Sequence, residues 1–153
     1  MDERFRKYYP NMAIGYDLCQ MKVIYIWPLF AVVWMLSDCQ RAPYQEGERL
    51  YTAHCANCHG EQGQGLGALI PPLAGSDYMQ KNASGLACIL VKGLSEEIVV
   101  NGKTYSGQPM PANETLTDIH VSNILNYINN SWGNHNGEVS LEAVRTMLKD
   151  CGK

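Results

Sequence analysis

Two cysteines and a histidine lie within five consecutive positions of the segment HCANCHGEQGQGLGALIPPLAG. Cys55, Cys58 and His59 could ligate a metal, form a redox-active disulfide or anchor a larger group. A structural zinc site would need a second pair of ligands, but Cys88 and Cys151 each stand without a CxxC or HxxxH partner. A thioredoxin-like site would need a strand-helix-strand context, whereas the surrounding sequence reads as helix and glycine-rich loop. Zinc binding and disulfide exchange are therefore disfavoured.

The pattern C-x-x-C-H is the signature for covalent attachment of haem c. On one helical turn the two sulfurs reach the two vinyl groups of one porphyrin edge and form thioethers. The adjacent imidazole is then aimed at the iron. Covalent attachment retains the haem in an exported protein, and the attachment machinery works outside the cytoplasm. The motif therefore predicts one haem c and an exported protein.

Over roughly residues 46–132 the chain resembles class I cytochromes c, through the motifs CANCH, PPLAG and QPMP. The resemblance implies that two cysteines form the thioethers, that the histidine is the proximal iron ligand, and that the carbonyl of the first proline in PPLAG accepts the Nδ1 proton of that histidine. Such a hydrogen bond orients the imidazole and makes it a stronger donor. The haem-binding residues implied are Cys55, Cys58, His59, Pro71, Leu73 and Met110.

The methionine of QPMP is the candidate for the second axial ligand. Met110 follows His59 by 51 residues (110 − 59), in a proline-stiffened loop like the methionine loop of the family. A thioether is a soft, neutral ligand that favours Fe(II) and raises the reduction potential. With both axial positions filled, the iron would have no open site. The alternative ligands are Met79, Met147, His120 and His135.

Helices and loops are expected to position these residues. Glycines between residues 60 and 67 indicate a loop that continues to Pro71, and a polar segment over 101–107 leads to the QPMP loop. Almost no period-two alternation appears, so the sequence predicts an all-α domain over 46–151, wrapped around the haem and ending in a helical extension. The expected helices are one from Glu46 into the CxxCH motif, one over 84–91, one over 118–132 capped by Thr117, and one over 141–149 after Ser140.

The resemblance also implies how the first helix and the last strong helix pack. In the family these two helices cross through a small residue and aromatic side chains. Here Gly47 and Tyr51 are expected to meet Ile124 and Tyr127. A large side chain at position 47 should break this crossing by overpacking.

An export pattern precedes the domain. The 14 apolar residues from Val23 to Leu36 follow a lysine, and as a helix they would reach about 21 Å, short of the roughly 30 Å hydrocarbon layer. This length is typical of a signal peptide, which we expect over residues 21–38. Because a signal seldom begins twenty residues late, we expect residues 1–20 to be an artefact of an upstream start codon or to be disordered.

The sequence LSDC at the end of this signal resembles a bacterial lipoprotein signal. The resemblance implies a lipid on Cys39, with residues 39–45 as a tether to the membrane. Asp38 differs from the Gly, Ala or Ser that this signal prefers before the cysteine. An ordinary signal peptide cut elsewhere and a short uncleaved anchor are therefore the alternatives.

Two cysteines remain after these assignments. Cys88 and Cys151 are the two cysteines without another assignment. An oxidising compartment favours disulfides, so we expect them to pair. Two buried free thiols are the alternative, because a sequence contains no distances.

The chain carries 12 Lys and Arg against 15 Asp and Glu, a net charge of −3, without a basic run, which argues against nucleic-acid binding. The leading hypothesis is a membrane-tethered, periplasm-facing electron carrier without catalysis of its own, whose partners are oxidases, reductases or dehydrogenases. The segment SWGNHNGEVSLEAV loosely resembles the end of cytochrome domains of copper nitrite reductases and molybdenum sulfite dehydrogenases. A subunit of such an enzyme is the second hypothesis, and a haem sensor or peroxidase with an open sixth site is the third.

Overall fold

The computed structural model describes residues 42–151, so the expectations for residues 1–20, for the signal at 21–38 and for Cys39 lie outside it. Within the described residues, no helix has the length and apolar character needed to cross a membrane. The chain in this part is mostly helical, as the sequence predicts. In order, the elements are α2 (Gln45–His54), α3 (Ala56–His59), α4 (Asp77–Lys81), the 3-10 helix η1 (Ala83–Gly85), α5 (Leu86–Lys92), β1 (Ile98–Val100), β2 (Lys103–Tyr105), α6 (Asp118–Asn129) and α7 (Leu141–Asp150).

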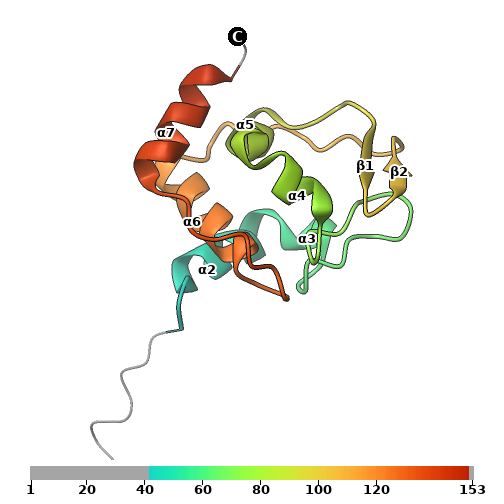
Figure 1. The fold of residues 1–153 in the computed structure, drawn as a ribbon, viewed down its shortest axis with the longest axis horizontal. Coiled ribbons are helices and arrows are strands. Elements are labelled where there is room, and N and C mark those ends of the chain that lie inside the picture. Colours follow the sequence, from blue (N-terminus) through green and yellow to red (C-terminus); the bar gives the residue numbers. More distant parts are fainter. Residues whose placement is uncertain (1–41, 152–153) are drawn as a thin grey trace, which may run out of the picture. The chain divides into compact units, whose positions relative to one another are not determined.

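Helices α2 and α6 cross in close contact (Figure 1). A Cβ atom added at Gly47 would lie 2.7 Å from the Cβ of Tyr127, and closer still to the Asn123 carbonyl oxygen. Beside this point the rings of Tyr51 and Tyr127 pack with centroids 5.5 Å apart, and Trp132 lies 4.9 Å from Tyr51. Only glycine lets the two backbones approach this closely, so the expected crossing is present.

The core lies where α6 meets α2, α5 and α7. α5 contacts both α6 and α7, and α6 contributes a continuous apolar face because its buried residues recur at helical spacing. The side chains with the least exposure come from all four helices, and include Tyr51, Ala87, Val121, Ile124, Leu125 and Val144.

The start of α6 agrees with the sequence, but its end does not. Thr117 Oγ1 accepts a hydrogen bond from the His120 backbone N–H at 3.2 Å, and His120 Nδ1 accepts one from the Thr117 N–H at 3.5 Å, which together form a capping box. The helix ends at Asn129, not at Trp132 as expected. Asn130, with φ −123° and ψ 14°, already leaves the helical backbone, and Trp132 after it is left-handed with φ 53°.

A two-stranded hairpin over residues 98–105 overlaps the segment 101–107, which the sequence predicts only as polar. β1 and β2 pair antiparallel, with Ile98 opposite Tyr105 and Val100 opposite Lys103. The turn consists of Asn101 and Gly102 with φ values of 51° and 75°, the signs that a type I′ hairpin turn requires. Each strand has three residues, too few for period-two alternation to show, although Asn-Gly after β-branched residues was a usable signal.

The C-terminal helix α7 is held to the rest of the domain in three ways. Its Val144 is fully buried, and Arg145 Nε lies 2.6 Å from an Asp118 carboxylate oxygen at the start of α6. A disulfide joins Cys88 on α5 to Cys151, which follows α7. Closing a loop with a sequence separation of 63 residues stabilises the fold by about 4 kcal/mol in the chain-entropy treatment.

We predict that Gly47→Val lowers the free energy of unfolding by about 3 kcal/mol, because the added side chain overlaps Tyr127 and the Asn123 carbonyl. Chemical denaturation measures the change. Gly85→Ala is the matched control, since nothing lies within 4 Å of the added Cβ, and it should cost no more than about 0.5 kcal/mol. Equal losses in the two variants would show that the crossing is not tight.

Candidate functional site

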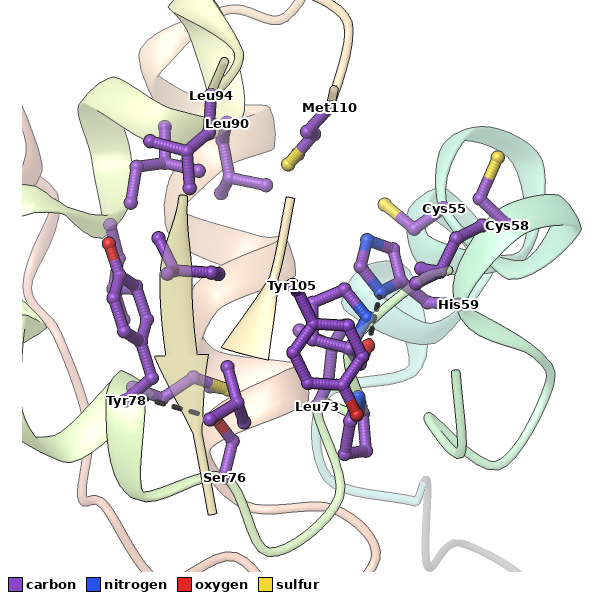
Figure 2. A pocket seen from close by; sticks show the side chains of 18 of the residues that line it. Cys55, Cys58, His59, Leu73, Ser76, Tyr78, Leu90, Leu94, Tyr105 and Met110 are labelled. Atoms are coloured by element: carbon purple, nitrogen blue, oxygen red, sulfur yellow. Dashed lines mark hydrogen bonds between the residues drawn. The ribbon is translucent and has the colours of Figure 1, made fainter. Parts of the chain in front are cut away.

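A cavity of about 240 Å³ lies between the CxxCH motif, α5, the hairpin and the QPMP loop (Figure 2). Its wall is mainly apolar, with the hydroxyl-bearing side chains of Ser76, Tyr78 and Tyr105 at the end away from Met110. Such a lining excludes water and suits a large apolar group that carries a few polar atoms. The apolar wall includes Ile70, Leu73, Leu86, Leu90, Leu94 and Val100.

The two sulfurs lie at one edge of this cavity. The sequence predicts one helix running into the motif, but α2 ends at His54 and α3 begins at Ala56, with Cys55 between them at φ −122°. Cys55 and Cys58 are both free of disulfides and both line the cavity. The break leaves Cys55 between the two helices and Cys58 on the short helix α3, both at the cavity edge.

The environment of Cys55 disfavours its thiolate form. Burial, with a smaller contribution from Cys58, raises the pKa of the Cys55 thiol to about 11. The raised pKa disfavours the thiolate that disulfide exchange requires. Among residues 42–151 no group of three His, Cys, Asp or Glu side chains could hold a metal ion.

His59 presents a neutral imidazole to the cavity. Its Nδ1 lies 3.2 Å from the Pro71 carbonyl oxygen. A carbonyl only accepts hydrogen bonds, so Nδ1 carries the proton and Nε2 keeps a free lone pair. Burial lowers the pKa of His59, which the bond to Pro71 partly offsets. A neutral ring with this tautomer is the form that ligates iron, and the bond is the one that the resemblance implies.

Close approach of backbones holds the Pro71 carbonyl in place. The Gly65 N–H donates to the His59 carbonyl at 2.8 Å. A Cβ added at Gly65 would lie 2.8 Å from the Pro71 oxygen and closer to the Ile70 oxygen, and its φ of 68° is left-handed. The glycine therefore allows the loop to fold back against the residue that binds His59.

Met110 faces the cavity from the side opposite His59, and Figure 2 shows its sulfur pointing into the space between them. Its backbone is bound to the segment just after α5, because Leu94 and Met110 exchange N–H to carbonyl hydrogen bonds of 2.9 and 2.8 Å. Gly93 permits this contact, since a Cβ there would lie 2.8 Å from the Ala112 nitrogen. The methionine is thus carried by a fixed loop.

The other candidate ligands are placed differently. Met79 lines the cavity from α4 and is 2% exposed, so it is the second methionine near the site. His120 belongs to the capping box of α6. Met147, His120 and His135 are not among the residues that line the cavity.

Sequence reasoning missed several contributors to the site. Leu94, which anchors Met110, and Tyr105 on the hairpin had no motif to mark them. Ser76 caps α4 by accepting from the Met79 N–H at 3.4 Å, and a serine followed by aspartate was a usable signal for that helix. Asn134 had no motif either, yet it is buried and donates a hydrogen bond to the Leu73 carbonyl.

The residues present fit a covalently attached haem. An apolar cavity has two free thiols at one edge, a neutral imidazole with a free Nε2 and a thioether on the opposite side. These are the functional groups that thioether attachment and axial ligation of iron require.

Comparisons with known proteins agree with this fit. Residues 44–132 match the family model described as cytochrome c. Cytochrome c-552 of Thermus thermophilus is 36% identical over 92 residues, which cover 58% of this chain and 69% of that protein. The cytochrome c subunit of a quinone alcohol dehydrogenase from Gluconacetobacter polyoxogenes is 29% identical over 108 residues, which cover 69% of this chain but only 23% of that subunit.

We predict that Gly65→Ala lowers the free energy of unfolding by about 3 kcal/mol, through left-handed backbone strain plus overlap with the Pro71 carbonyl. Gly67→Ala is the matched control: it has a left-handed φ of 56° but nothing within 4 Å of the added Cβ. It should cost only the strain, about 1 kcal/mol. Denaturant unfolding compares the two, and equal losses would mean that the contact with Pro71 is unimportant.

Proposed function

Because the chain belongs to the cytochrome c family, we propose that it carries single electrons between redox proteins on one haem c ligated by His59 and Met110. The family binds haem covalently, and Cys55 and Cys58 occupy the attachment positions of the CxxCH motif. The observation that carries the proposal is the placement of a neutral imidazole and a thioether on opposite sides of one apolar cavity.

When bound, the haem supplies a reversible Fe(III)/Fe(II) couple. The chain contributes ligand identity, fixed geometry and a dry environment. His59 is held through Nδ1 by Pro71, and Met110 through its backbone by Leu94. Segments held in this way move little when the charge of the site changes. Rapid electron exchange needs this small movement of the ligands. The thioether and the apolar wall both favour the less charged reduced state.

The same arrangement argues against a sensor or peroxidase. Those functions need an open or labile position on the iron, whereas the Met110 side chain points into the cavity from a loop stiffened by Pro109 and Pro111. We therefore propose electron transfer, and not the binding of a small molecule to the iron, as the function of this domain.

We also propose that the domain works on the periplasmic side of a bacterial membrane, held there by a lipid on Cys39. The disulfide between Cys88 and Cys151 supports an oxidising compartment. The apolar run from Val23 to Leu36 and the need for haem attachment outside the cytoplasm support export.

A second candidate function is that of a cytochrome subunit in a periplasmic oxidoreductase. The relative from Gluconacetobacter polyoxogenes, and a further one from Komagataeibacter europaeus that is also 29% identical, are both named as cytochrome c subunits of a quinone alcohol dehydrogenase. A dehydrogenase is therefore a reasonable partner class, alongside the nitrite reductase and sulfite dehydrogenase types that the C-terminal segment suggests.

We predict that Met110→Leu abolishes the weak long-wavelength absorption band that methionine sulfur gives with ferric haem, lowers the reduction potential and allows rapid carbon monoxide binding after reduction. Leucine keeps the apolar volume but offers no sulfur. Met79→Leu is the matched control, because Met79 also lines the cavity, and it should keep the band. Loss of the band in Met79→Leu alone would assign the ligand to Met79.

We predict that the protein, purified from its native membranes in mild detergent, elutes as a single chain that a membrane oxidase can oxidise. Stable co-elution with a larger dehydrogenase or reductase would favour the subunit function instead. Mass spectrometry of the eluted fractions distinguishes the two outcomes, with a sample washed at high salt as the control for loose electrostatic contacts.

A further inference from the structure

The segment after α6, residues 131–134, binds the loop over residues 60–75 that follows the CxxCH motif. The Trp132 ring covers Gly63, where an added Cβ would lie 2.6 Å from the ring atom Cζ3. Trp132 has a φ of 53°. A bulky residue adopts this backbone only when its surroundings require it, at a cost of about 1 to 3 kcal/mol. The strained turn directs the chain back toward the loop.

Asn134 uses its whole side-chain amide on three backbone groups. Its Oδ1 accepts from the Gly75 N–H at 2.8 Å, and its Nδ2 donates to the Leu73 carbonyl at 3.0 Å and to the Ile128 carbonyl at 2.7 Å. The residue is 4% exposed. A buried amide satisfied in this way is a rigid connection, because breaking any one of the bonds leaves a polar group without water.

These bonds hold the part of the loop next to Pro71. The N–H groups of Leu73 and Ala74 both donate to the Gly63 carbonyl, at 2.7 and 2.9 Å. Residues 73–75 are therefore bound to the start of the loop on one side and to Asn134 on the other. Pro71 is two residues before Leu73, and its carbonyl accepts the Nδ1 proton of His59.

We propose that Asn134 is a positioning residue for the haem iron: by fixing residues 73–75 it holds the Pro71 carbonyl against His59 Nδ1 and so sets the donor strength of the proximal ligand. The inference rests on the proposed role of His59. When the bond to Pro71 is weakened, the imidazole donates less charge and Fe(III) is less stabilised. The reduction potential then rises.

A purely structural role must be separated from this one, because the bond from Asn134 to the Ile128 carbonyl also caps α6. Asn126 provides the matched comparison. Its amide likewise binds backbone, accepting from the Val139 N–H at 2.7 Å and donating to the Val139 carbonyl at 3.1 Å. Those bonds hold the segment before α7 and do not touch the 60–75 loop.

The experiment compares Asn134→Leu and Asn126→Leu in the haem-loaded protein. Two quantities are measured: the reduction potential, and the hydrogen exchange rate of the His59 Nδ1 proton in the reduced, diamagnetic form by NMR. We expect Asn134→Leu to raise the potential and to accelerate exchange of the ring proton by roughly tenfold or more. Asn126→Leu should lower stability while leaving both quantities unchanged. An unchanged potential and ring-proton exchange in folded Asn134→Leu would overturn the proposal, as would equal changes in the two variants.

The unmodified protein provides a second measurement that does not depend on how the variants fold. If Asn134 positions Pro71, the Gly75 N–H and the His59 Nδ1 proton are released by the same opening and share one opening free energy under native conditions. Exchange of the ring proton through an opening that leaves the Gly75 N–H protected contradicts the proposal. The absorption spectrum of the unmodified protein tests the proposed function separately. A spectrum without covalently bound haem, or with iron that His59 does not ligate, would contradict that function whatever the result for Asn134.

Discussion

The structure depends on one hydrogen bond, from His59 Nδ1 to the Pro71 carbonyl. A histidine in an apolar cavity must be neutral, and to serve as an iron ligand it must also leave Nε2 free. A carbonyl partner at Nδ1 meets both requirements, but only if a loop returns to the motif and stays there. The close approach of Gly65 and the covering of Gly63 by Trp132 follow from that requirement.

Helix α5 connects the opposite side of the site to the rest of the domain. Just beyond its C-terminal end Leu94 pairs with Met110, and within the helix Cys88 is bonded to Cys151, which follows α7. Leu86 and Leu90 on the same helix line the cavity. One short helix therefore supports the methionine loop, forms part of the cavity wall and anchors the C-terminal extension.

The match to the family model ends at residue 132, but residues after it also hold the site in place. Asn134 binds the 60–75 loop, and α7 covers α5 and α6. The residues that we propose to bind the haem, from Cys55 to Met110, lie within the matched region. Asn134 and α7, which support this region, lie in the part of the chain beyond the match.

The sequence by itself determined the chemistry: the spacing of Cys55, Cys58 and His59 identified the cofactor, and the amphipathic pattern after Thr117 located α6 at its start. These features are local, set by covalent spacing and helical periodicity. The tertiary structure decided what depends on contacts between distant segments, namely the break at Cys55, the left-handed turn at Trp132 that follows α6, and the three bonds of Asn134. A buried asparagine and an exposed asparagine after a helix look alike in a sequence. Only the fold brings residues some sixty positions apart within hydrogen-bonding distance.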